Sequence, residues 1–277
     1  FESANANLIS WEHKLENHRL LKLIFGEVHF QLRAVMIHQD INRISYFKKI
    51  VDEGFYQKYF FCGSDIRKQF LIEYPNLSLR SFTITNTVFI DRVMSFADQE
   101  EITDDFDCVT VGGLREQKNI ETMINAFSIL SDMGCPYKLC IIGDGKLRAQ
   151  LQNQVSKLGI DTISFLGHIN NPLPYVKKSK LYVSSSLYEG LPISLLEALV
   201  LGRYLVISDC VGNSELVKHV SQITSFPVGN SIALAEAIFK HYKKFGNRSQ
   251  NSDFCFEESY ISPKKVKLEF LRAVSYD

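Results

Sequence analysis

The sequence predicts an α/β protein built from doubly wound parallel sheets. Between about residues 107 and 244, short and nearly continuous apolar runs alternate with segments of helical period. Runs that are apolar throughout are typical of strands that are buried on both faces of a parallel sheet. Helical segments between such strands supply the two layers that cover the sheet.

The strands and helices of this region follow from these two periods. Six apolar runs are predicted as strands, at residues 108–111, 138–142, 162–166, 180–184, 204–207 and 222–226. The helices predicted between them cover residues 120–133, 147–158 and 192–201. Glycine follows each of the three helices and Pro192 opens the last one, which are ordinary stop and start signals.

The first hundred residues also mix strands with helices, although less regularly. Strands are predicted at residues 33–37, 59–62 and 82–84, and helices at 41–54 and 64–74. We expect residues 1–100 to form a first, partial domain and residues 107–250 a second domain, with the acid-rich stretch 97–106 as the linker. Because the chain starts at Phe1 and a full α/β half usually needs more residues, we expect part of the first domain to be missing.

Composition and charge limit the classes of function. Of the 277 residues 45% are hydrophobic and 22% charged, which is an ordinary globular balance. A formal net charge of +0 gives no reason to expect a nucleic-acid partner. The sequence has no apolar run near the ~20 residues that span a bilayer, which leaves peripheral membrane contact open. The six cysteines form no Cys-x-x-Cys pair, so a reducing, cytoplasmic setting without a zinc site is expected.

Ligands of open α/β sheets bind beyond the carboxyl ends of the strands, so a binding site is expected in the loops there. The loop after strand 108–111 holds Gly112 and Gly113, which allow close backbone approach, followed by the cations Arg115 and Lys118. Two cations on a glycine loop suit a diphosphate, and the alternative is a turn with solvated charges. The loop is neither G-x-G-x-x-G nor a P-loop, so nicotinamide cofactors and ATPase activity are not supported.

The segment after strand 180–184 carries the strongest signal. Glu189 lies in the loop, Gly190, Leu191 and Pro192 lead into the predicted helix, and Glu197 follows inside it. The amide groups at the start of a helix, together with its dipole, form an anion site. A carboxylate on each side could bind sugar hydroxyls, whereas the alternative is one surface acid and one acid at the edge of the core.

These segments together resemble retaining glycosyltransferases with the GT-B fold, the group 1 or family 4 class. Glu189 and Glu197 match the E-x7-E motif of that class. The other matching segments are residues 112–119, 142–145, 165–167 and 208–215. The resemblance implies two Rossmann-like domains that face a cleft, with an incomplete acceptor-side domain first and the donor-binding domain second. It also implies that the helix expected in the tail, residues 251–277, crosses back to the first domain.

The resemblance further implies roles for single residues. Glu189 would lie near the donor sugar, Glu197 would bind the ribose hydroxyls, and Lys118 would neutralise the diphosphate leaving group. The start of the helix would line the diphosphate, through the residues Gly190, Leu191, Pro192 and Ile193.

Two more positions are assigned from the resemblance. The backbone near Gly167 and Ile169 would meet the nucleobase. Residues 34–40 resemble a strand ending in His-x-Asp in capsule and exopolysaccharide members, which makes His38 a candidate active-site residue at the cleft. The alternative for His38 is a structural histidine at a strand end.

One position departs from the family pattern. The family usually has Gly-Arg where this chain has Gly112-Gly113, and Arg115 is the residue that could substitute for the missing cation. If it does not, the stabilisation of the leaving group is weaker.

The resemblance implies a cytoplasmic transferase of hexosyltransferase type that acts in the synthesis of surface polysaccharide. It would move a sugar from a UDP- or GDP-sugar to a saccharide or lipid-linked saccharide, with retention and at the inner face of the membrane. The nucleotide-sugar is a substrate, so no cofactor is expected and no metal ion is required. Two alternatives remain, a non-catalytic subunit that binds nucleotide-sugars and a UDP-sugar epimerase of the same fold.

Overall fold

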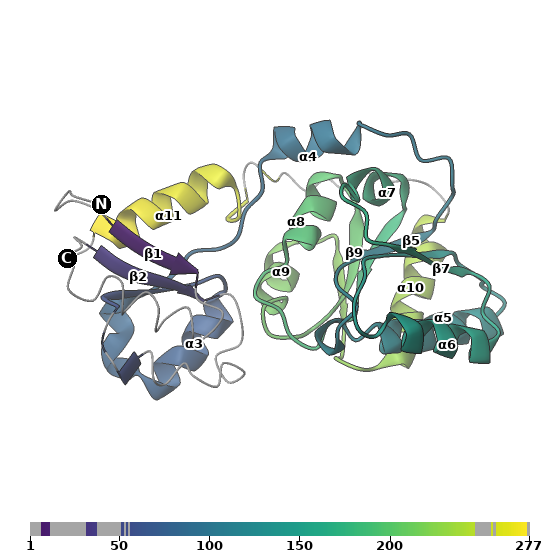
Figure 1. Ribbon diagram of the computed structural model, residues 1–277, viewed down its shortest axis with the longest axis horizontal. Coiled ribbons are helices and arrows are strands. Elements are labelled where there is room, and N and C mark those ends of the chain that lie inside the picture. Colours follow the sequence, from purple (N-terminus) through teal and green to yellow (C-terminus); the bar gives the residue numbers. More distant parts are fainter. Residues whose placement is uncertain are drawn as a thin grey trace.

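The computed structural model describes residues 7–11, 32–37, 51–52, 54, 56–246, 256 and 259–275. They form two parallel β-sheets in separate halves of the molecule (Figure 1). The predicted strands 33–37, 59–62 and 82–84 and all six strands of the second half are confirmed to within a few residues. The first sheet also contains a strand that was not predicted, at Asn7–Trp11.

The first sheet has the strand order β1-β2-β3-β4. Its strands are β1 (Asn7–Trp11), β2 (Leu32–Ile37), β3 (Lys58–Phe61) and β4 (Ser81–Thr83). Between β3 and β4 lie helix α3 (Ser64–Glu73) and a 3₁₀ helix, η2 (Pro75–Arg80). Side chains of β3 alternate between the faces, so Tyr59 and Phe61 pack towards α3 while Phe60 packs on the other face.

The C-terminal helix α11 (Pro263–Ser275) covers that other face of the first sheet. Val266 and Ala273 of α11 are buried in one cluster with Phe60, and Lys58 donates a hydrogen bond from Nζ to the carbonyl of Ala273 at 2.7 Å. The last helix of the chain therefore packs on the first half of the molecule and not on the second (Figure 1).

The second sheet has the strand order β10-β9-β8-β5-β6-β7, and every neighbouring pair is parallel. Its strands are β5 (Cys108–Val111), β6 (Leu139–Ile142), β7 (Ile163–Gly167), β8 (Leu181–Ser184), β9 (Tyr204–Ser208) and β10 (Ile223–Phe226). Because the chain moves outward from β5 in one direction and from β8 in the other, the topological switch point lies between these two strands. Ligands of doubly wound sheets bind at such a point.

Helices cover both faces of the second sheet. One face packs against α5 (Ile120–Asp132), α6 (Arg148–Leu158) and α10 (Ser231–Phe245). The other face packs against α4 (Ile90–Ala97), α7 (Leu173–Lys178), α8 (Ile193–Val200) and α9 (Ser214–His219). Helices α4, α7, α9 and α10 are additional to the predicted ones. In the described part of the chain, no helix is long and apolar enough to cross a membrane.

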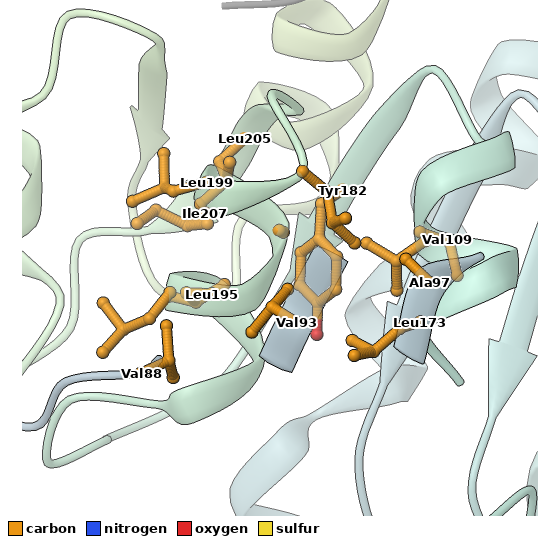
Figure 2. Packing of buried hydrophobic residues seen from close by; sticks show 14 of the residues in the cluster. Val88, Val93, Ala97, Val109, Leu173, Tyr182, Leu195, Leu199, Leu205 and Ile207 are labelled. Atoms are coloured by element: carbon orange, nitrogen blue, oxygen red, sulfur yellow. The ribbon is translucent and has the colours of Figure 1, made fainter. Parts of the chain in front are cut away.

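Helix α4 packs in the core of the second half. Val93 and Ala97 belong to the same buried cluster as Tyr182 of β8 and Leu195 of α8 (Figure 2). The sequence-based division at residue 100 would place this helix with the first domain. The packing differs from that division because the apolar face of α4 is buried against α7 and α8.

The core of the second half provides a test of this packing. We expect Leu196→Ala in α8, where the leucine is fully buried, to lower the free energy of unfolding by about 2–5 kcal/mol, because it leaves a cavity. Ile232→Ala in α10, where the side chain is 62% exposed, should change it by less than about 0.5 kcal/mol. Urea denaturation measures both, and equal losses would contradict the observed packing.

Candidate functional site

Three loops meet at the carboxyl edge of the second sheet. They follow β5, β8 and β9, the strands at or next to the switch point. The amide of Leu187 donates to the carbonyl of Gln117 at 2.8 Å, and the amide of Glu189 donates to the carbonyl of Val211 at 2.9 Å. The loop after β8 is therefore bonded to the loops on both of its sides.

A glycine allows the loop after β9 to approach so closely. Gly212 has a φ of +94°, and a Cβ at this position would collide with the carbonyl groups of Glu189 and Gly190. Only glycine combines this backbone conformation with the absence of a Cβ. The position of the loop that carries Glu189 thus depends on a residue 23 positions further along the chain.

Glu189 is buried and has three polar partners. Its side chain is 7% exposed and forms an ion pair with Nζ of Lys118 at 2.5 Å. Ser186 donates a hydrogen bond from Oγ to Oε1 of Glu189 at 2.6 Å, and Nε2 of Gln117 donates to Oε2 at 3.4 Å. Burial of a carboxylate is costly without such partners, and here the loops after β5 and β8 hold one charge pair between them.

Arg115 and Gly113 fit together. A Cβ on Gly113 would lie 2.9 Å from Nε and 3.2 Å from Nη2 of Arg115, so the guanidinium group occupies the space that a side chain at position 113 would need. A Cβ on Gly112 would likewise lie 3.1 Å from Cε of Lys118. The two glycines therefore make room for the two cations of the loop.

The helix after Glu189 begins one residue later than predicted. Pro192 has a ψ of 128° and precedes α8, which starts at Ile193, because an extended ψ at this proline is incompatible with a helical turn. The amides of Ile193 and Ser194 have no backbone acceptor within the described part of the chain. Leu191 is only 3% exposed, so its side chain belongs to the core and its backbone alone can face a ligand.

The first half of the molecule contacts this helix start. Asn86 donates a hydrogen bond from Nδ2 to the carbonyl of Leu191 at 2.7 Å. A Cβ on Gly63, in the loop after β3, would lie 3.2 Å from the carbonyl of Gly190. The loop that joins Glu189 to α8 is thereby held by the first sheet and by the second.

Two hydrogen bonds join helices of the two halves. The amide of Ser64, in α3, donates to Oε2 of Glu215, in α9, at 2.9 Å, and Ser214 donates to Asp65. The bond from Ser214 lowers the pKa of Asp65. The two helix starts thus exchange polar contacts across the boundary between the halves.

Glu197 lines a cavity of about 340 Å³. Burial raises the pKa of its carboxyl group above the ordinary value. Within the described residues its side chain has no hydrogen-bond or ion-pair partner. Ile193, one turn earlier in α8, lines the same cavity, and so do Asn170 and Asn171 from the loop after β7.

The residues predicted to meet a nucleobase lie at the end of β7. Gly167 has a φ of +76°, and its carbonyl accepts a hydrogen bond from the amide of Gly143 at 2.7 Å. Ile169 is partly buried against the core cluster of α7 and α8, so the next two residues, and not Ile169 itself, reach the cavity of Glu197.

The structure brings most of the predicted positions to one edge of the second sheet, and one of them cannot be placed. His38 lies outside the described residues. Sequence reasoning did not select Ser186 or Gln117, which bond to Glu189, although the polar run of serines at the end of β8 was a signal for the first of them. Among the described residues, no group of three acidic, histidine or cysteine side chains could hold a metal ion.

The sequence matches a known family. The profile of the family Glycosyl transferases group 1 covers residues 93–250, which is more than half of the chain. An uncharacterized glycosyltransferase of Methanocaldococcus jannaschii is 31% identical over 55% of this chain and 42% of its own length. An α-1,4-N-acetyl-D-galactosaminyltransferase of Campylobacter jejuni, named for an acceptor linked to diphospho-undecaprenol, is 30% identical over 57% of this chain and 46% of its own. The chain thus spans less than half the length of these two relatives.

Solved structures share the fold at lower sequence identity. Anabaena HepE, solved in complex with UDP, superposes with a TM-score of 0.76 at 15% identity, over 97% of this chain and 78% of its own. The lipopolysaccharide outer core galactosyltransferase WaaB superposes with a TM-score of 0.73 at 18% identity, over 99% and 76% of the two chains. These likenesses confirm the predicted α/β fold of GT-B type.

The close approach at Gly212 can be tested on stability. We expect Gly212→Ala to lower the free energy of unfolding by about 1–2 kcal/mol for the left-handed backbone and by a further ~1–3 kcal/mol for the collision with the loop of Glu189. Gly229→Ala is the matched control, because Gly229 has a φ of +76° with no atom near its would-be Cβ. If chemical denaturation gives equal losses of unfolding free energy for the two variants, the collision does not destabilise the protein.

Proposed function

The chain belongs to the group 1 glycosyl transferases, and from this premise we propose that its second half binds a nucleotide-sugar whose sugar is transferred to a saccharide or lipid-linked saccharide. The observation that carries the proposal is the arrangement at the switch point. Lys118 and Arg115 lie on the loop after β5, the free amides at the start of α8 follow Glu189, and an unpartnered Glu197 lines a cavity beside them.

Transfer breaks the bond between the anomeric carbon and the diphosphate, so negative charge develops on the leaving group. Lys118, Arg115 and the amides of α8 are the groups that would stabilise that charge. Before the donor binds, the ion pair with Glu189 keeps Lys118 in place at 2.5 Å. A bound diphosphate would then share Lys118 with the carboxylate of Glu189, which also accepts a hydrogen bond from Ser186.

Arg115 is proposed to replace the arginine that the family carries at position 113. Its guanidinium lies within 3.2 Å of the would-be Cβ of Gly113, in the space that the family arginine would start from. A side chain that begins two residues later thus offers its charge to the same loop. This geometry supports catalysis over the alternative of a non-catalytic binding subunit, which the missing arginine motivates.

The two glutamates are assigned different parts of the donor. Glu189, fixed by Ser186 and Lys118, would face the sugar, and Glu197 would accept hydrogen bonds from the ribose hydroxyls. The carboxylate of Glu197 lacks a protein partner in the described part of the chain. The two ribose hydroxyls would donate the hydrogen bonds that it lacks. Resemblance to the retaining class supports transfer with retention.

The partners are proposed from the family and its relatives. UDP- and GDP-sugars are the expected donors, and the presence of UDP in the HepE structure is consistent with the first of them. A lipid-linked acceptor would place the enzyme at the inner face of a membrane, in the synthesis of surface polysaccharide. We propose that the reaction needs no cofactor and no metal ion, and that His38 contacts the donor sugar or the acceptor.

Lys118 is the first residue to test. We expect Lys118→Ala to reduce turnover about tenfold to a thousandfold, the effect of losing one electrostatic contact to the transition state. Release of nucleoside diphosphate from UDP- and GDP-sugars, with a saccharide acceptor, measures it. Lys146→Ala is the control, because Lys146 is exposed and pairs with Glu116. Unchanged turnover in a folded Lys118→Ala protein would refute the assignment.

The substitution at position 113 allows a rescue experiment. We expect Arg115→Ala to lower turnover by a similar factor of about ten to a thousand, because the leaving group loses a cation. Adding Gly113→Arg to that variant should restore part of the activity, since the alanine frees the space beside residue 113. If wild-type protein binds the nucleotide-sugar but releases no diphosphate, the non-catalytic alternative is favoured.

A further inference from the structure

The cavity that contains Glu197 has a second wall that comes from outside the donor-binding loops. On one side lie Ile193 and Glu197 of α8 and the loop after β7. On the other side lie the residues before α4 and α4 itself, which connect the two sheets. The inference drawn from this wall rests on the proposed function, because it concerns which nucleotide the same site accepts.

Four side chains of this connection line the cavity, three from α4 and one from the residue just before it. Within α4, Phe96 follows Arg92 by four residues and Val93 by three, which places Phe96 on the same side of the helix as each of them. Phe89 precedes the helix and lines the same cavity. Val93 is 4% exposed and anchors this face in the core. Phe89 and Phe96 are 68% and 36% exposed, so two aromatic rings stay accessible beside the cavity.

Arg92 lies over the ring of Phe96. Its guanidinium carbon is 5.3 Å from the centre of the Phe96 ring, a cation–π distance. Within the described residues this guanidinium has no carboxylate or carbonyl partner. The cavity therefore contains an unpaired donor group on α4 and an unpaired acceptor group, Glu197, on α8.

Helix α4 is held firmly in this position. Asn171 donates from Nδ2 to the carbonyl of Phe96 at 2.8 Å and to Oε1 of Gln99 at 3.2 Å. Asp98 forms an ion pair with Lys177 of α7. With Val93 and Ala97 buried in the core, the wall is in place before any ligand arrives, which lowers the entropic cost of binding.

We propose that α4 is the base-recognising wall of the donor site, where Phe96 stacks against the nucleobase and Arg92 donates hydrogen bonds to its carbonyl oxygen. Aromatic rings stack on any base, whereas a guanidinium only donates and so selects a base edge that accepts. Uracil and guanine present a carbonyl oxygen where adenine presents an amino group. The wall thus favours uridine or guanosine diphosphates over adenosine diphosphate.

Isothermal titration of the whole chain with UDP, GDP and ADP tests this proposal. Wild-type protein should bind UDP or GDP more tightly than ADP. Arg92→Ala should lower the affinity for the preferred nucleotide about tenfold to a hundredfold and the affinity for ADP much less, so that discrimination between nucleotides is lost. Phe96→Ala should lower the affinity for all three nucleotides about fivefold to a hundredfold, because stacking does not depend on the base.

Two further variants separate the possible causes. Ser95→Ala changes an exposed residue of α4 that does not line the cavity, and it should leave every affinity unchanged. Lys118→Ala should weaken the three nucleotides by one common factor, because it acts on the diphosphate.

The outcomes distinguish this inference from the proposed function. If wild-type protein binds none of the three nucleotides, the proposed function fails. If it binds them, and folded Arg92→Ala protein either keeps wild-type affinities or loses all three by the same factor, only the role of α4 is overturned.

Discussion

The ion pair between Lys118 and Glu189 connects the loops after β5 and β8, the two strands on either side of the topological switch point. Lys118 follows β5 and Glu189 follows β8, and these strands are neighbours although 71 residues separate the two side chains. A carboxylate as buried as that of Glu189 is costly without a counter-charge, so the position of each loop depends on the other. The site at the switch point therefore depends on this one charge pair.

Backbone contacts that exclude side chains surround the pair. Gly212 brings the loop after β9 against the carbonyl of Glu189, and Gly63 brings the first sheet to the carbonyl of Gly190. Since carbonyl groups face these glycines, the amides at the start of α8 stay available for an anion. At Gly113 the absence of a side chain likewise leaves room for the guanidinium of Arg115.

The two halves of the molecule contribute to each other's structure. Helix α11 ends the chain on the first sheet, while α4, which leaves the first sheet, is buried in the core of the second. Asn86, Asp65 and Glu215 add polar contacts between the halves beside the candidate site. A nucleotide bound against α4 would contact the connection as well as the loops of the candidate site.

The sequence by itself determined the α/β class, nearly all of the strands, the loop positions of Lys118 and Glu189, and the position of Glu197 inside the helix that follows. These depend on local periodicity, glycine and proline signals and fixed motif spacing, which a single segment expresses on its own. Only the tertiary structure decided that Ser186 supports Glu189, that Arg115 fills the space beside Gly113, and that α4 faces Glu197. Such contacts depend on how side chains fill the space between segments, and no local pattern in the chain specifies that packing.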